Sequence, residues 1–160
     1  MIKVAICDDD PIFLKLLEQM IEQIARSSGQ FVEFVEFQAG EPLMHYLKQN
    51  QNHVDILFLD IDMGGQTGFD LLRALGEDKP HVIFTTAHDS YAVKAIRFSA
   101  LDYLLKPIDR ADLEMAIERA RRLIRASDKS DMYEVLLKNM DRSQADRVLT
   151  RRLKEALELV

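Results

Sequence analysis

The stretch Val54-Asp55-Ile56-Leu57-Phe58-Leu59-Asp60-Ile61-Asp62-Met63-Gly64-Gly65 decides the fold of this chain. Its apolar centre, bounded by turn-forming residues, is typical of a buried parallel strand. The run ends on the carboxylate of Asp60, and glycines follow shortly afterwards. In an open α/β sheet, ligands bind at the carboxyl ends of the central strands. Because an ionised carboxylate placed there costs free energy unless cations or hydrogen bonds compensate it, Asp60 is a candidate chemical group.

Four more apolar runs predict strands, at residues 2–7, 31–37, 82–86 and 101–105. Apolar residues at helical spacing predict helices at residues 11–27, 40–47, 68–76, 91–98 and 109–125. Asp10 before Pro11 fits a helix N-cap with proline at the first helical position. Five strands that alternate with five helices predict an α/β fold with a doubly wound parallel sheet and right-handed crossovers.

The composition is that of an ordinary globular protein, with 48% hydrophobic and 30% charged residues among 160. No stretch reaches the roughly 18 apolar residues of a membrane span. The first strand runs straight into acids, which is unlike a signal peptide. Cys7 is the single cysteine, so an internal disulfide is excluded. We therefore expect a cytoplasmic protein that does not contact a membrane.

Two segments of the chain differ in composition. Residues 1–126 hold the acid excess behind the net charge of −6, and we expect them to form one domain. After a polar joint at residues 127–130, two amphipathic stripes predict a helical extension over residues 127–160, used either for packing or to recognise a partner. Neither segment has the basic excess of a nucleic-acid-binding module, so direct nucleic-acid binding is not expected.

The ends of the predicted strands bring several polar residues together. In the flavodoxin-like strand order 2-1-3-4-5, the first, third, fourth and fifth strands are neighbours, and the switch point lies between the first and the third. These four strands end, in chain order, at Asp8 with Asp9, at Asp60, at Thr86 and at Lys106. Three carboxylates so close together repel one another unless a cation lies among them. Mg²⁺, a hard ion that prefers oxygen ligands, suits this edge.

This edge of the sheet predicts phosphoryl chemistry. Asp60 would attack a phosphoryl group and form an acyl phosphate. Mg²⁺ and Lys106 would neutralise the non-bridging oxygens, and the Thr86 hydroxyl would bond one of them. Simpler interpretations stand beside these. The acids at residues 8–10 can cap a helix, threonine is frequent at strand ends, and Lys106-Pro107, a candidate cis peptide, is also a common strand-terminating turn.

The motifs at these positions resemble the receiver domain of bacterial two-component response regulators over residues 2–126. The matching motifs are Cys7-Asp8-Asp9-Asp10, Leu59-Asp60-Ile61-Asp62-Met63, Gly68, Thr86-Ala87 and Asp102-Tyr103-Leu104-Leu105-Lys106-Pro107. The resemblance implies that Asp60 is the phosphoacceptor and that a sensor histidine kinase supplies the phosphoryl group. It also implies metal ligation by Asp8, Asp9, Asp60 and the Asp62 backbone carbonyl, phosphate pairing by Lys106, and switching by Thr86 and Tyr103.

The run at residues 84–96 is similar to receivers of the LytTR class, which usually carry a DNA-binding output domain. Such a class implies a homodimer on phosphorylation, formed through the fourth helix, fifth strand and fifth helix. Two features depart from the family. Gly64 stands where the family usually has proline, so we expect a looser loop. Residues 127–160 are too few for an output domain on the order of 100 residues, so we expect that domain to be absent.

Two alternatives belong to other functional classes. Asp60-Ile61-Asp62 resembles the nucleophile motif of haloacid-dehalogenase-like phosphatases, although in that family the further metal acids follow the nucleophile instead of preceding it. A module that kept the fold but lost the chemistry is the other alternative. Asp62 and His88, two residues beyond Asp60 and Thr86, would lie where water approaches, so we expect them to modulate dephosphorylation. Tyr103 is either a moving switch or a core residue.

Overall fold

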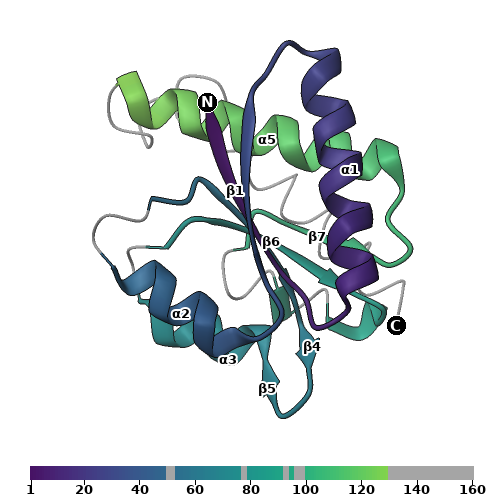
Figure 1. The fold of residues 1–160 in the computed structure, drawn as a ribbon, viewed down its shortest axis with the longest axis vertical. Helices are drawn as coiled ribbons and strands as arrows, with labels where there is room; N and C mark the ends of the chain where they lie inside the picture. The colour runs from purple at the N-terminus through teal and green to yellow at the C-terminus, as the bar shows by residue number, and fades with distance from the viewer. Residues whose placement is uncertain (50–52, 77–78, 92–93, 96–99, 130–160) are drawn as a thin grey trace, which may run out of the picture.

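The computed structural model describes residues 1–49, 53–76, 79–91, 94–95 and 100–129. Its strands are β1 (Ile2–Cys7), β2 (Val32–Phe37), β3 (Ile56–Asp60), β4 (Asp62–Met63), β5 (Gln66–Thr67), β6 (His81–Thr86) and β7 (Asp102–Leu105). Its helices are α1 (Pro11–Ser27), α2 (Gly40–Lys48), α3 (Gly68–Leu75), α5 (Arg110–Lys129) and the short 3-10 helix η1 (Asp89–Tyr91). Strands and helices alternate along the chain, as an α/β fold requires (Figure 1).

The five long strands form one parallel sheet in the order β2-β1-β3-β6-β7. When these strands are counted along the chain, this is the predicted order 2-1-3-4-5, and the flavodoxin-like fold is confirmed. In the register, Ile6 lies beside Phe58, and Phe58 lies beside Ile83. The central strand β3 is buried at every position, as its unbroken apolar run predicted.

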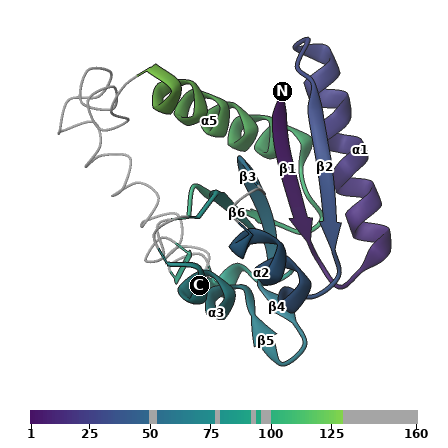
Figure 2. The ribbon, with the colours of Figure 1, turned by 60° about the vertical axis from the view of Figure 1, so that its left-hand side comes forward.

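Successive residues of each strand point to opposite faces of the sheet, which divides the core into two clusters. From β3, Ile56 and Phe58 pack in the cluster that also holds the buried residues of α1 and α5. Leu57 and Leu59 pack in the other cluster, with the buried residues of α2 and α3. Figure 2 shows the paired strands β1 and β2 with α1 on one side of them and α2 on the other. Helices therefore cover both faces of the sheet. The polar side chains of the predicted site lie at the ends of the strands, outside the two apolar clusters.

The helices that follow β1 and β5 begin with side-chain caps. The Asp10 carboxylate accepts a hydrogen bond from the Ile12 amide at 3.0 Å, and Pro11 occupies the first turn of α1, so the predicted N-cap is confirmed. Helix α3 begins with a capping box, in which Thr67 and Asp70 each accept from the other's backbone amide at 3.2 Å. These caps fix where α1 and α3 start relative to the strands that carry the site.

Helix α5 runs further than the sequence predicted. It continues through Lys129, the last residue that the structure describes, whereas we expected an end at residue 125 and a polar joint at residues 127–130. The joint contains neither Gly nor Pro, and serine, aspartate and lysine each cost a helix at most roughly 0.7 kcal/mol, so polar composition alone does not stop it. The predicted helix at residues 91–98 lies largely outside the described residues, and so does the extension from residue 130 onwards. None of the helices in the described ranges has the length and apolarity needed to cross a membrane.

The segment after Asp60 is a hairpin that the sequence did not predict. In the antiparallel pair β4 and β5, Asp62 lies opposite Thr67 and Met63 lies opposite Gln66. Gly64 and Gly65 form the two-residue turn with φ of 56° and 79°. Positive φ at both central positions is what a type I′ turn requires. A paired turn therefore takes the place of the looser loop that we expected from Gly64.

Candidate functional site

Three carboxylates meet at the carboxyl end of the sheet. Asp8 follows β1 and Asp60 ends β3, and these strands are paired, with Cys7 beside Leu59. Asp8 is 1% and Asp60 4% exposed, whereas Asp9 is exposed. One carboxylate oxygen from each of Asp8, Asp9 and Asp60 lies within 4.8 Å of the other two. The structure thus brings together the three predicted metal acids.

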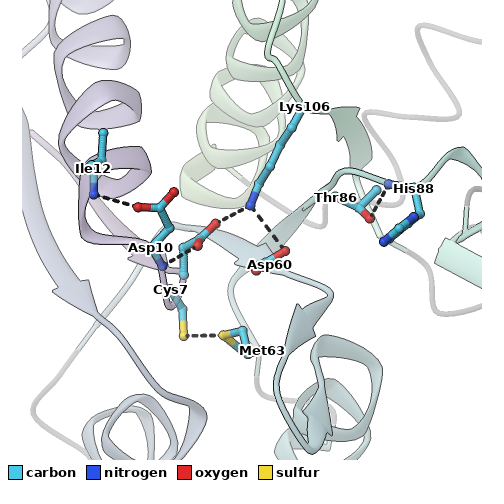
Figure 3. A network of polar contacts seen from close by, with 9 residues as sticks. Cys7, Asp10, Ile12, Asp60, Met63, Thr86, His88 and Lys106 are labelled. Atoms are coloured by element: carbon cyan, nitrogen blue, oxygen red, sulfur yellow. Dashed lines mark hydrogen bonds and ion pairs between the residues drawn. The ribbon is translucent and has the colours of Figure 1, made fainter.

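The Lys106 ammonium faces two of these acids. Its Nζ lies 2.7 Å from Oδ2 of Asp8 and 3.5 Å from Oδ1 of Asp60, as Figure 3 shows for Asp60. Lys106 follows β7, and its backbone amide donates to the Thr86 carbonyl at 2.7 Å, which extends the β6–β7 pairing to the site. The Lys106–Pro107 peptide bond is cis, as the sequence suggested.

The loop between β1 and α1 is held by the end of β2, by a hydrogen bond within the loop and by Lys106. The Asp8 amide donates to the Phe37 carbonyl at 3.0 Å. The Asp10 amide donates to Oδ1 of Asp8 at 2.9 Å, while the other oxygen of Asp8 accepts from Lys106. Lys106 also lies over the ring of Phe13, with Nζ 4.2 Å from the centroid. Phe13 was missed from the sequence, because no motif distinguishes it from the other apolar residues of α1.

Burial changes the acidity of Asp60. Loss of water around its carboxylate, together with repulsion from Asp8, raises the pKa of Asp60 from 3.8 to about 6. The Lys106 ammonium and a hydrogen bond from the Asp62 backbone oppose that rise. Asp60 therefore carries its charge at neutral pH against a desolvation penalty, and a cation among the acids would relieve the penalty.

The donor set fits a hard divalent cation such as Mg²⁺. The clustered ligands are carboxylate oxygens, which Mg²⁺ and Ca²⁺ prefer and which softer metals do not. Cys7, the neighbouring thiol, is buried, and burial followed by repulsion from Asp8 raises its pKa to about 12. A protonated thiol is a poor metal ligand. Asp8, Asp9 and Asp60 would hold the ion.

Thr86 lies at the end of the neighbouring strand β6. Its predecessor Thr85 is the register partner of Asp60, and Thr86 is fully buried. Its Oγ1 accepts a hydrogen bond from the His88 amide at 3.0 Å (Figure 3). The hydroxyl is therefore at the predicted strand end, with its proton available to a second acceptor.

Asp62 and His88 meet at the outer side of the site. The Nε2 atom of His88 lies 3.5 Å from Oδ2 of Asp62, and the two side chains are 61% and 43% exposed respectively. The sequence placed both residues near the approach of water but did not predict that they contact each other. Their contact joins the hairpin after β3 to the loop after β6.

Tyr103 lies in β7 beside Phe84 of β6. It is half-buried and packs against the cluster that α2 and α3 cover. Burial, with a smaller contribution from the Asp89 carboxylate, raises the pKa of its hydroxyl. This position agrees both with a core residue and with a switch, so its role stays a prediction.

Gly68 allows α3 to approach the strand that carries Asp60. Its amide donates to the Ile61 carbonyl at 2.8 Å. A Cβ atom at this position would lie 2.7 Å from the Asp60 carbonyl oxygen and 3.2 Å from Cγ of Leu59. The backbone oxygen cannot move aside without shifting β3, so glycine is required here.

The sequence of this chain matches a known protein family. The sequence profile described as "Response regulator receiver domain" matches residues 4–118. The Sensory transduction protein LytR of Staphylococcus haemolyticus is 32% identical over 147 residues, which are 91% of this chain and 55% of that protein. The Transcriptional regulatory protein BtsR of Escherichia coli is 39% identical over 124 residues, or 76% of this chain and 48% of that one. The chain therefore spans about half the length of these relatives.

Solved structures share the fold. The response regulatory domain of protein mrkE from Klebsiella pneumoniae is 28% identical, with a TM-score of 0.64 over 81% of this chain and 100% of that domain. The response regulator protein TrrA from Thermotoga maritima, solved in complex with Mg(2+)-BeF, has a TM-score of 0.63 over 75% of this chain and 99% of that one. Its 21% identity shows the fold alone.

Proposed function

This chain belongs to the response regulator receiver domain family, and we propose that it accepts a phosphoryl group on Asp60 from the phosphohistidine of a sensor histidine kinase. One observation carries the proposal. Asp60 is a buried carboxylate with two further acids within 4.8 Å and a lysine at 3.5 Å. An isolated structural acid would not need this arrangement, whereas a group that receives and holds a phosphoryl dianion does.

The transfer is an in-line displacement at phosphorus. An Asp60 carboxylate oxygen attacks, the bond from phosphorus to the donor's imidazole nitrogen breaks, and the imidazole keeps the electron pair. Lys106 would pair with the phosphoryl oxygens, and the Thr86 hydroxyl would donate to one of them. Asp8, Asp9, Asp60 and the Asp62 backbone carbonyl would hold Mg²⁺, which when bound supplies charge neutralisation to the phosphoryl oxygens. TrrA, which shares the fold, has been solved in complex with Mg(2+)-BeF.

The output of the switch would be a change of shape at one face. The new dianion would draw Thr86 inward and let Tyr103 fill the vacated space, which changes the face formed by the predicted helix at residues 91–98, β7 and α5. Such a face responds only if it has two packings of similar free energy. By its similarity to the LytTR class, the chain would dimerise through this face. Sizing with and without beryllofluoride tests the dimer, and an unchanged mass removes it.

The partners follow from this function. The chain would meet its kinase in the cytoplasm, would bind neither nucleic acid nor membrane directly, and would act through a receiver unit at residues 1–126 with a helical extension at residues 127–160. Catalysis would be limited to its own phosphorylation and slow dephosphorylation. The relatives named above are about twice as long, so the activity of a longer regulator is a separate question.

Intact mass after incubation with acetyl phosphate and Mg²⁺ tests the function directly. Wild type should gain the mass of one phosphoryl group, and the Asp60→Asn variant should gain none. A wild type that is not modified would favour an interaction module without the chemistry. Rapid hydrolysis of p-nitrophenyl phosphate would favour the phosphatase alternative that uses Asp60 and Asp62.

A further inference from the structure

Phe13, in the first turn of α1, contacts the lysine of the site through the face of its ring. Lys106 Nζ lies 4.2 Å from the ring centroid, well inside the range of a cation–π interaction. The Lys106 side chain is only 22% exposed, and such interactions strengthen when the cation is partly desolvated. The same ammonium contacts two charged groups, Asp8 at 2.7 Å and Asp60 at 3.5 Å.

The ring is held in place by the start of the helix. Asp10 caps α1 through the Ile12 amide, and Pro11 fixes the first turn, so the direction of Phe13 is set by the backbone. Phe13 is half-buried and packs against the cluster between the sheet and the α1 and α5 helices. Its ring is therefore a fixed surface that the lysine approaches.

An uncharged partner such as the Phe13 ring can hold the Lys106 side chain without neutralising the positive charge that would pair with the phosphoryl oxygens. A carboxylate that holds the ammonium also cancels its charge, and both carboxylates near Lys106 belong to the acid cluster that would hold a cation. An aromatic face attracts the ammonium through its quadrupole and leaves the charge uncancelled. Resting on the proposed function, we propose that Phe13 is a positioning residue, which keeps the Lys106 ammonium beside Asp60 when Asp8 is engaged by a cation.

The contact has a signature in NMR that does not depend on phosphorylation. Protons on Cε of Lys106, next to an Nζ that lies over the ring, should resonate upfield of an ordinary lysine because of the ring current. The shift should persist in Phe13→Tyr, which keeps the ring, and disappear in Phe13→Leu, which keeps an apolar side chain. Phe34→Leu is the matched control, since Phe34 is also half-buried against the same cluster and sits on β2.

The same four proteins are then compared in the rate of phosphorylation by acetyl phosphate at saturating Mg²⁺. Phe13→Leu should be slower by about three- to tenfold, the size expected for one partly desolvated cation–π contact. Phe13→Tyr and Phe34→Leu should react within about twofold of wild type. Circular dichroism and thermal unfolding show whether each variant is folded, and the tyrosine variant gives a result even if the leucine variant is not.

Three results would overturn the proposal. These are an unshifted Lys106 signal in wild type, an unchanged rate in folded Phe13→Leu, and an equal loss of rate in Phe34→Leu. If Phe13→Leu does not fold, a tenfold loss of rate in Phe13→Tyr would overturn it as well. A wild type that shows the shift but takes no phosphoryl group would refute the phosphoacceptor role and still support the placement of the lysine by Phe13.

Discussion

The Lys106 ammonium lies 2.7 Å from the Asp8 carboxylate, although 98 residues separate them in the chain. Asp8 is almost fully buried, so this contact compensates a charge that solvent does not reach. The lysine lies closer to Asp8 than to Asp60, whose Oδ1 is 3.5 Å from Nζ. Since Asp8 would also be a ligand of the cation, lysine and cation compete for the same carboxylate.

Replacing Lys106 by methionine should therefore have opposite effects on stability and on metal binding. Without metal, the free energy of unfolding should fall by about 3 kcal/mol, because Asp8 loses its partner. Mg²⁺ should bind more tightly, because no ammonium has to be displaced. Denaturant unfolding and calorimetric titration measure the two quantities. Lys15→Met, which removes an exposed pair with Glu36, is the control and should cost about 0.5 kcal/mol or less. Weaker Mg²⁺ binding by Lys106→Met would contradict this competition.

The raised pKa of Asp60 predicts a pH-dependent cost to stability. The pKa rises from 3.8 to about 6 on folding, so the folded protein holds this proton more tightly than the unfolded chain. The contribution of Asp60 to the stability of the metal-free protein should therefore fall as pH increases from about 4 to about 6 and level off above that. Asp60→Asn removes the titrating group. It should lie within about 0.5 kcal/mol of wild type at pH 4 and be more stable by about 3 kcal/mol at pH 7.5.

The difference between wild type and Asp60→Asn isolates this term, because the other acids titrate in both proteins. Urea unfolding at several pH values gives the difference, and Asp62→Asn, an exposed acid in the same segment, serves as the control. Addition of Mg²⁺ should shrink the gap at pH 7.5, since the ion compensates the Asp60 charge. A gap that is the same at pH 4 and pH 7.5 would show that Asp60 keeps an ordinary pKa.

The sheet and the acids could be predicted from the sequence because each strand carries a local signal. The unbroken apolar run before Asp60 and the acids directly after the first strand place three carboxylates at one edge once the strand order is assumed. Contacts that depend on side-chain direction carry no such signal. Lys106 contacts Asp8 and Phe13, and His88 contacts Asp62. The packing of segments that are distant in the chain sets these three contacts.

Two local features were predicted incorrectly, for different reasons. The Gly64-Gly65 pair was taken as a sign of a looser loop, although two glycines between short extended pieces also satisfy a type I′ turn. The end of α5 was placed too early because a polar segment was taken as a helix stop. Termination needs a residue that disfavours the helical backbone, and none occurs before Lys129.

The geometry of the hairpin predicts that Gly64 cannot be replaced by proline, the residue that the family usually has at this position. Proline fixes φ near −65°, whereas Gly64 has φ of 56°, so Gly64→Pro should disrupt the turn instead of rigidifying it. The Gln66 amide, which donates to the Gly64 carbonyl at 2.9 Å, should then exchange with deuterium at least about tenfold faster. Gly64→Asn, which tolerates positive φ in this turn, is the control and should exchange like wild type. Unchanged protection in the proline variant would contradict the turn.

The contact between Asp62 and His88 bears on how long the phosphoryl group lasts. Their side chains meet 3.5 Å apart at the outer side of the site, where a hydrolytic water would approach phosphorylated Asp60. A carboxylate can accept a hydrogen bond from that water and orient its lone pair toward phosphorus. Asp62→Ala should therefore slow dephosphorylation by about three- to tenfold. The decay of the phosphorylated mass after removal of acetyl phosphate measures the rate.

Further variants separate orientation of water from repulsion of it. Asp62→Asn keeps a hydrogen-bond acceptor without the charge, so it should lie between wild type and Asp62→Ala if orientation dominates. If the Asp62 charge instead repels water or hydroxide, Asn and Ala would both decay faster than wild type. His88→Ala removes the imidazole that contacts the Asp62 carboxylate and should change the half-life in the same direction as Asp62→Ala, because the carboxylate loses one contact that fixes its position. Identical half-lives in all four proteins would remove Asp62 and His88 from the dephosphorylation step.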